Sequence, residues 1–198
     1  LSEAYAVLDK YGEDAVPIAG STFFMGHREE LFDEVEAVVD IKRLGLGYIK
    51  IGDGELRLGA TTTLAEIEHS SELKNSPYRV LPETVSELNI KEVRNVATVG
   101  GEVCIAGEVD LPTTLLALDA EIVIGSSKGE RSLPMKEFHR GYLNNALESG
   151  EMVKEVRIPD PGAGAAASFQ KFERTYADLP LVNVAVRVNL NGMMEVDS

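Results

Sequence analysis

The sequence predicts an α+β fold whose strands pair largely in antiparallel fashion. Asp53-Gly54 separates two alternating apolar runs within residues 48–60, which is a strong β-hairpin signal. Thr63-Leu64-Ala65-Glu66 is a capping box that opens a helix. Valines stand at every second position from 182 to 188, as in a strand with two unlike faces. With 44% hydrophobic residues, the 198-residue chain can bury one ordinary core or two small ones.

The first fifty residues predict a helix followed by a βαβ-like unit. Residues 2–11 carry an apolar stripe at helical spacing, with Ser2 as the expected cap and Gly12 as the expected end. Residues 15–19 form a short apolar run typical of a strand, and residues 34–41 predict the next strand. We expect the unit that these segments form to close near residue 50.

The middle of the chain alternates helices with hairpins. The capping-box helix is expected to reach about Ser71, and a second helix is predicted over residues 78–89. Asp110 stands where it would cap a helix running to Leu118, because Pro112 suits a first helical turn. Further strands are predicted over residues 121–124, 131–133, 152–158, 169–172 and 182–190, and a turn at Asn191-Gly192 is expected to lead into residues 193–196.

The run of small residues from Gly162 to Ala167 predicts a domain boundary. We therefore divide the chain into an N-terminal subdomain (1–50), a second subdomain (51–165) and the start of a C-terminal domain (166–198). Because a lone hairpin is marginal in water, more chain or a partner should cover the C-terminal strands. The chain starts at Leu1 rather than Met, so we expect a fragment of a longer protein.

Composition narrows the function classes. The net charge of −14 repels nucleic acid and anionic lipid, so we expect neither as a partner. No apolar run is long enough to span a bilayer and no signal-peptide pattern is visible, which favours a cytoplasmic protein. The single cysteine, Cys104, rules out an internal disulfide, and the 3 histidines show no metal-type spacing.

Two glycine-containing segments are candidate phosphate-binding loops. Residues 94–101 end in Gly100-Gly101, and residues 17–23 join an apolar lead to a glycine and two hydroxyl side chains. We expect the paired glycines to allow positive φ and to let successive N–H groups converge on an anion. Two such loops could hold both phosphates of a dinucleotide, although glycine pairs more often serve only tight turns.

An ordered set of motifs resembles one family over nearly the whole chain. No motif is decisive alone, but their order is specific to the FAD-binding (medium) subunit of the molybdenum hydroxylases, which includes the medium subunit of carbon monoxide dehydrogenase and the flavin domain of xanthine dehydrogenase. The motifs are Ala19-Gly20-Ser21-Thr22, Leu58-Gly59-Ala60-Thr61-Thr62-Thr63, Val93 through Gly101, Asp110-Leu111-Pro112 with Leu115 through Ala120, Phe169-Gln170-Lys171-Phe172 and Ala177-Asp178-Leu179.

The resemblance implies the vanillyl-alcohol oxidase (PCMH-type) FAD-binding fold, with two α/β subdomains and a C-terminal α+β domain. It also implies an oxidoreductase subunit that takes electrons from iron–sulfur clusters and passes them through FAD to an external acceptor. The 2Fe-2S clusters and the molybdopterin would belong to a small and a large partner subunit of a hetero-oligomer. The resemblance further implies that this subunit would need no acid–base residue and no metal of its own.

By position, the resemblance implies specific contacts with the cofactor. The two loops would hold the pyrophosphate, Asp110 would bind ribose or ribityl hydroxyls, and Leu179 would lie on the isoalloxazine face. From the residues alone, Asp110 serves equally well as a helix cap, and Leu179 would by default be a core residue. The expected cofactor-binding residues are Ala19, Gly20, Ser21, Thr22, Phe23, Thr98, Val99, Gly100, Gly101, Glu102, Asp110, Val153, Lys171 and Leu179.

Three departures from the family pattern gather at the expected phosphate site. Glu102 replaces the usual asparagine after the two glycines, and Ser21 replaces the second glycine of the first loop. Residues 104–109 lack the usual Asn and Ser-Pro. A serine at positive φ would be strained, and a carboxylate beside a phosphate would repel it. The alternative is therefore a scaffold or binding subunit of the same fold, with a weakened or lost flavin site and no redox role.

Overall fold

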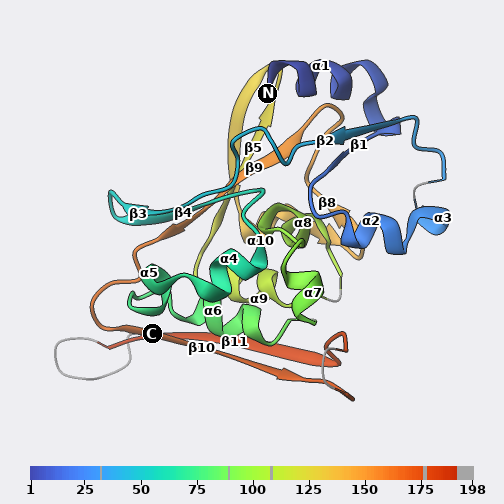
Figure 1. The fold of residues 1–198 in the computed structure, drawn as a ribbon. Helices are drawn as coiled ribbons and strands as arrows, with labels where there is room; N and C mark the ends of the chain where they lie inside the picture. The colour runs from blue at the N-terminus through green and yellow to red at the C-terminus, as the bar shows by residue number, and fades with distance from the viewer. Residues whose placement is uncertain (32, 89, 108, 176–177, 191–198) are drawn as a thin grey trace.

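The fold is given by a computed structural model that describes residues 1–31, 33–88, 90–107, 109–175 and 178–190. Its centre is a five-stranded antiparallel sheet in the order β3-β4-β9-β5-β6 (Figure 1). The strands are β3 (Ile49–Gly52), β4 (Glu55–Gly59), β5 (Glu121–Ser126), β6 (Gly129–Pro134) and β9 (Met152–Pro159). The predicted hairpins and the strand that joins them are therefore confirmed.

The turn between β3 and β4 shows why the hairpin signal was reliable. Asp53 and Gly54 both have positive φ, at 53° and 78°. Two such residues match the right-handed twist of the flanking strands, and Asp-Gly tolerates this conformation better than most pairs. The turn fixes the register at Gly52 opposite Glu55, which directs Leu56 and Leu58 into the core with no exposed surface.

The N-terminal unit is a separate small layer. Its strands β1 (Ala15–Ile18) and β2 (Ala37–Asp40) pair in parallel, as a βαβ-like unit requires. Gly12 ends the first helix at φ 60° as expected, but Leu1, not Ser2, occupies the N-cap position and no side chain caps it. The helical elements of this unit are α1 (Ser2–Tyr11), the 3₁₀ turn η1 (Gly12–Asp14), α2 (Thr22–Gly26) and α3 (Arg28–Leu31).

A layer of short helices covers the central sheet. The capping box is present, since the Glu66 N–H donates to Thr63 Oγ1 at 3.2 Å and the Thr63 N–H donates to Glu66 Oε2 at 2.7 Å. The helix predicted over residues 78–89 is shorter, at Val80–Ser86. The helices are α4 (Leu64–His69), α5 (Ser71–Lys74), α6 (Val80–Ser86), α7 (Lys91–Arg94), α8 (Val99–Cys104), α9 (Leu111–Ala117) and α10 (Met135–Phe138).

A buried ion pair ties α7 to α4. Only 6% of Arg94 is exposed. Its Nε donates to Glu68 Oε2 at 2.8 Å and its Nη2 to Glu68 Oε1 at 3.1 Å, while Nη1 donates to the Leu88 carbonyl at 3.0 Å. This two-point geometry is the strongest that arginine makes with a carboxylate. It fixes the start of the segment that leads into α8.

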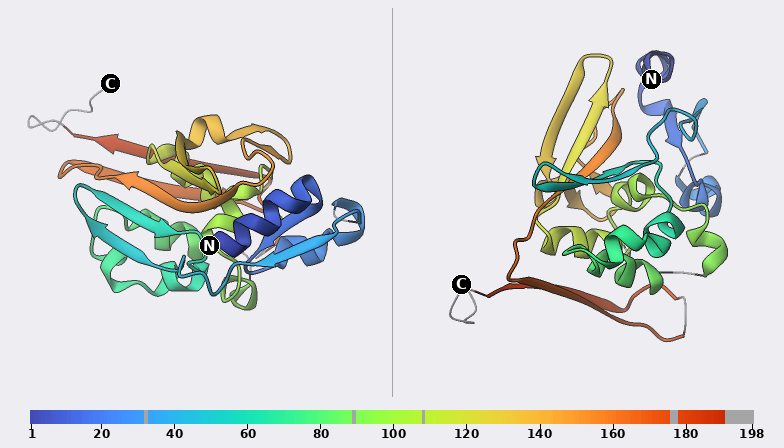
Figure 2. Two further views of the ribbon diagram at one scale, coloured as in Figure 1. Left: turned by 90° about the horizontal axis from the view of Figure 1, so that it is seen from above. Right: turned by 60° about the vertical axis from the view of Figure 1, so that its left-hand side comes forward.

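A two-stranded ribbon lies on the far side of the helices. Strands β10 (Ala165–Phe172) and β11 (Val182–Asn189) pair antiparallel and pack on α6 and α9, so that the helices lie between the ribbon and the central sheet (Figures 1 and 2). The outward face carries Val182, Val184 and Val186, each more than half exposed. The predicted run 182–190 is thus a strand, but the turn predicted at residues 191–196 lies outside the described residues.

The large core forms between the central sheet and the helices, and a smaller core lies between α1 and the β1–β2 pair. A short pair, β7 (His139–Gly141) and β8 (Asn144–Asn145), follows α10. In the portion of the chain that the structure describes, no helix has the length and apolarity needed to cross a membrane. The boundaries expected at residues 50 and 165 stay predictions.

Candidate functional site

The first candidate loop joins β1 to α2 and presents backbone donors. Ser21 adopts the left-handed conformation, with φ 59° and ψ 10°, where the sequence pattern anticipated strain. Among the described residues, the N–H groups of Gly20, Ser21 and Thr22 find no acceptor in the protein. Consecutive N–H groups on a turn of this kind suit an anion such as a phosphate.

The second loop differs from the expectation in its conformation. Gly100 and Gly101 lie inside α8 and neither has positive φ, so the prediction of a left-handed glycine turn was wrong. The N–H groups are already bonded within the protein: Val99 donates to Thr62 O at 2.9 Å, Gly100 to Ala60 O at 2.8 Å and Gly101 to Thr98 Oγ1 at 3.3 Å. Thr98 therefore acts as the cap of α8.

Glycine is needed at these positions for close packing. A Cβ on Gly20 would lie 2.0 Å from the Val96 carbonyl oxygen, and one on Gly100 would lie 2.9 Å from the Ala60 carbonyl oxygen. Both are closer than real Cβ atoms approach. The first loop thus rests directly on the segment before α8, and the two candidate loops are in contact, as the dinucleotide hypothesis required.

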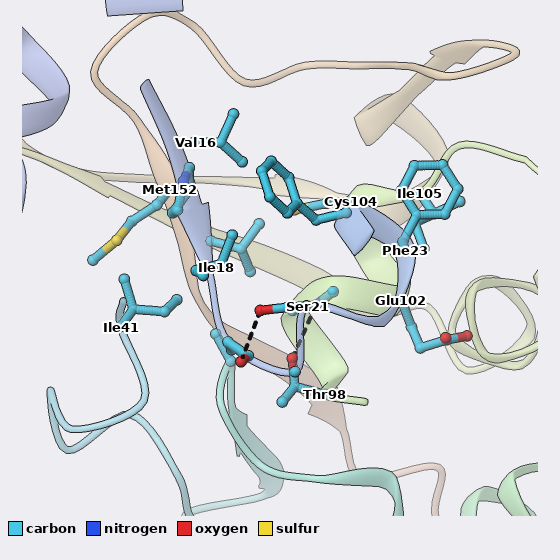
Figure 3. A pocket seen from close by; sticks show the side chains of 18 of the residues that line it. Val16, Ile18, Ser21, Phe23, Ile41, Thr98, Glu102, Cys104, Ile105 and Met152 are labelled. Atoms are coloured by element: carbon cyan, nitrogen blue, oxygen red, sulfur yellow. Dashed lines mark hydrogen bonds between the residues drawn. The ribbon is translucent and has the colours of Figure 1, made fainter. Parts of the chain in front are cut away.

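A cavity of about 460 Å³ opens beside the two loops (Figure 3). Its polar groups gather at the loops, whereas β1, the end of β2 and the start of β9 supply apolar side chains. Sequence-predicted residues in its lining are Ala19, Gly20, Ser21, Thr22, Phe23, Thr98, Gly100, Gly101, Glu102 and Val153. Lining residues that sequence reasoning missed include Val16, Ile18, Ile41, Cys104, Ile105, Leu143, Asn145, Leu147 and Met152.

The segment after α10 holds the C-terminal end of α8 against this cavity. His139 Nε2 lies 2.7 Å from the Val103 carbonyl oxygen, and Asn145 Nδ2 donates to the Cys104 carbonyl at 2.9 Å. Burial raises the pKa of the Cys104 thiol to about 12, so it stays protonated and acts as a small apolar residue. No local sequence signal marks this segment, because its role is to satisfy carbonyls about forty residues away in sequence.

Four predicted residues lie outside the cavity lining. Val99 is fully buried in the main core, and Leu179 is 56% exposed rather than packed in the core. Asp110 and Lys171 form a buried ion pair, with Oδ2 and Nζ 3.2 Å apart. Asp110 occupies the N-cap position of α9, but its side chain makes no capping bond and instead accepts a hydrogen bond from Asn183 Nδ2 at 2.7 Å.

Glu102 lines the cavity, and the charges of Asp110 and Lys171 act on its carboxyl. Figure 3 shows its carboxyl pointing away from Ser21 and Thr98, so it does not fill the space between the two loops. Burial raises the pKa of Glu102 to about 7, and the nearby negative charge of Asp110 adds to this shift. The positive charge of Lys171 opposes it. Burial lowers the pKa of Lys171, but its contacts with Glu173 and Asp110 outweigh this and leave the pKa raised.

The conformation of Ser21 gives a direct stability prediction. A left-handed L-residue costs roughly 1–2 kcal/mol, and glycine avoids most of this while losing more chain entropy on folding. We expect Ser21→Gly to raise the free energy of unfolding by about 0.5–1 kcal/mol, measured by urea denaturation. The neighbouring Thr22→Gly is the matched control and should lower it, because Thr22 is helical. Equal effects of the two variants would contradict the strain argument.

The comparisons with known proteins place this geometry in a family. A family model described as "FAD binding domain in molybdopterin dehydrogenase" matches residues 1–161. The chain is 31% identical to the 6-hydroxypseudooxynicotine dehydrogenase complex subunit alpha of Paenarthrobacter nicotinovorans, over 96% of this chain and 65% of that one. It is 32% identical to the nicotinate dehydrogenase FAD-subunit of Eubacterium barkeri, over 88% of this chain and 60% of that one.

A solved structure agrees. Carbon monoxide dehydrogenase from Hydrogenophaga pseudoflava superposes with a TM-score of 0.93 at 27% identity, covering all of this chain and 69% of the other. The expected α+β FAD-binding fold is therefore confirmed. The chain spans less than two thirds of the length of the two relatives compared by sequence. On these grounds the chain belongs to the family of FAD-binding domains found in molybdopterin dehydrogenases.

Proposed function

We propose that this chain is the FAD-binding part of a molybdenum hydroxylase-type dehydrogenase. In that role it takes electrons from iron–sulfur clusters in a partner and passes them to an external acceptor. Bound FAD would supply the redox chemistry, while the protein positions and shields it. The observation that carries the proposal is the cavity at the contact of the two candidate loops, where the N–H groups of Gly20, Ser21 and Thr22 have no acceptor within the described part of the chain.

The residues present suit a dinucleotide with a charged centre and flat, largely apolar ends. The three N–H groups of the first loop would bind a phosphate oxygen, and Thr98 would fix the neighbouring turn of α8. Val16, Ile18 and Ile41 would exclude water from one end of the ligand. The backbone of α8 contributes little, because its first N–H groups are already bonded.

The remaining predicted contacts extend this proposal. Asp110 and Lys171 are buried, with 4% and 3% of their side chains exposed. A buried carboxylate and ammonium held together are suited to bind hydroxyl or carbonyl groups at the far end of an extended ligand. Leu179, by contrast, is exposed and lies outside the cavity lining. The described residues alone therefore do not place it against a flavin face.

The partners are proposed from the family. Both relatives compared by sequence are named as subunits of dehydrogenases. We propose an iron–sulfur small subunit and a molybdopterin large subunit in one hetero-oligomer, with the 2Fe-2S clusters and molybdopterin held there. The outward valine face of β11 offers exposed apolar surface that such a partner could cover.

A cofactor titration tests the proposal. We expect the apo chain to quench the fluorescence of added FAD at pH 6 and to bind FAD at least about tenfold more tightly than riboflavin. The reason is that one charge-assisted hydrogen bond to phosphate contributes roughly 1.5–3 kcal/mol, and riboflavin has no phosphate. Absence of FAD binding to the folded chain across pH 5.5–8.5 would favour the scaffold alternative.

A further inference from the structure

Glu102 is a buried carboxyl whose role the proposed function leaves open. It is 7% exposed and lines the cavity, and its Oε2 has no hydrogen-bond partner among the described residues. Such an orphaned atom is costly, because folding removes its water without replacing it. A polar group held in this way at a cavity wall is suited to bond a ligand inside the cavity.

The charges around Glu102 do not neutralise it. Lys171 is the cation that faces it, but its Nζ already lies 3.2 Å from Asp110 Oδ2 and 2.8 Å from Glu173 Oε2. Asp110 faces Glu102 with the same sign of charge. An ionised Glu102 would thus be a third carboxylate beside one ammonium. Burying an uncompensated charge is strongly unfavourable, so the neutral acid is the stable form.

Among the described residues, the elements packed on α8 bring no further cation to Glu102. On β7, the titratable side chain of His139 lies with its Nε2 2.7 Å from the Val103 carbonyl oxygen. On β9, Arg157 Nε is bonded to Glu155 Oε1 at 2.7 Å, and Lys154 is paired with Glu130. On β4, Arg57 is paired with Glu55. Each of these cations is therefore already paired with another carboxylate. Its raised pKa, about 7, agrees with the geometry and places the ionisation of Glu102 within the physiological range.

We propose that Glu102 binds the cofactor as a neutral acid: its carboxyl donates a hydrogen bond into the cavity, and its ionisation weakens FAD binding. The inference rests on the proposed function. FAD carries two phosphate charges, so its arrival disfavours a second anion nearby and holds the proton on Glu102. Above the pH at which free Glu102 ionises, each FAD that binds must therefore bring about the uptake of one proton from solvent.

The sign of the pH dependence follows. Below about pH 7 Glu102 is already protonated, and the Kd for FAD should not depend on this group. Above it, protonating Glu102 becomes part of binding, and the Kd should rise by up to tenfold for each pH unit. Between pH 6 and pH 8.5 we expect a weakening on the order of tenfold.

The experiment compares the chain with two isosteric variants. Glu102→Gln keeps a donor but cannot ionise, so its Kd at pH 8.5 should equal that of the unaltered chain at pH 6. Glu92→Gln, an exposed residue of α7, removes the same charge elsewhere and should keep the full pH dependence. Kd is measured by flavin fluorescence, and proton uptake by calorimetry in buffers of different ionisation enthalpy. About one proton should be taken up at pH 8, and none by Glu102→Gln.

A third readout needs no cofactor. A carboxyl whose folded pKa is raised to about 7 stabilises the fold less and less as pH rises from its unfolded value toward 7. The melting temperature of the apo chain should therefore fall relative to Glu102→Gln between pH 5 and pH 8. A pH-independent Kd, or the same slope in Glu102→Gln, would overturn the inference and leave the proposed function intact. Absence of FAD binding in every variant would instead overturn the proposed function.

Discussion

Replacing Arg94 by methionine is expected to lower the free energy of unfolding by about 3 kcal/mol, because it leaves the Glu68 carboxylate and the Leu88 carbonyl without their partner. The loss should be largest near pH 7. The hydrogen bond from Arg94 holds the pKa of Glu68 below its ordinary value, although burial opposes this. The stability that Glu68 contributes is present above its unfolded pKa and is lost as pH falls through its folded pKa. Urea denaturation at pH 7 and at pH 3 measures the loss in unfolding free energy and its dependence on pH.

The matched control for Arg94→Met is the double variant with Glu68→Gln. It removes the stranded charge as well as the cation, so it should recover part of the lost stability. A single variant that loses less than about 1 kcal/mol would place this pair among weak surface ion pairs and contradict its structural role. A double variant less stable than the single one would show that Glu68 has another important partner.

Gly20→Ala is expected to have the largest effect on cofactor binding. Its Cβ would lie 2.0 Å from the Val96 carbonyl oxygen, so the first loop must move away from the segment before α8. Overpacking of this kind costs roughly 1–3 kcal/mol or more. If the displaced loop also loses its phosphate contacts, FAD affinity should fall on the order of a hundredfold, as a change of about 3 kcal/mol implies. Fluorescence titration with FAD at pH 6 measures this.

Gly26→Ala provides the comparison for Gly20→Ala. It adds the same methyl group at the end of α2, where no atom lies within 4 Å of the new Cβ. We expect unchanged FAD affinity and a small gain in stability. Equal affinities in the two alanine variants would show that the contact between the loops does not position the phosphate donors.

Local chemistry predicted the elements better than their contacts. The Asp53-Gly54 turn and the Thr63–Glu66 box were reliable because the residues that define each element are neighbours in sequence. The prediction of positive φ at Gly100 was wrong for a physical reason. Glycine serves equally for positive φ and for close approach, and here Ala60, forty residues earlier, makes approach the reason. A single sequence does not distinguish the two.

The candidate site likewise has a part that local sequence predicts and a part that only the tertiary structure brings together. The first loop was predicted from its residue types and their order, and the strain at Ser21 from its departure from the family pattern. Asp110 and Lys171 are sixty-one positions apart, and only the family resemblance brought them into one site. The missing information is tertiary: the apolar wall of the cavity comes from strands whose Val16, Ile18 and Met152 look like ordinary core residues. Nothing in their local sequence marks them as lining a cavity.

The outward valines of β11 have a mechanical consequence. The inner side of that strand is attached to the helices by polar groups, with Asn183 bonded to Asp110 and Arg187 paired with Asp119. The more apolar face of the strand, with its exposed valines, points away from the helices. Raised ionic strength should weaken the partly exposed Arg187–Asp119 pair, whereas Phe169 and Ala185 keep the inner face packed on the main core. A partner that covered the outer face would gain the free energy of burying the exposed valines.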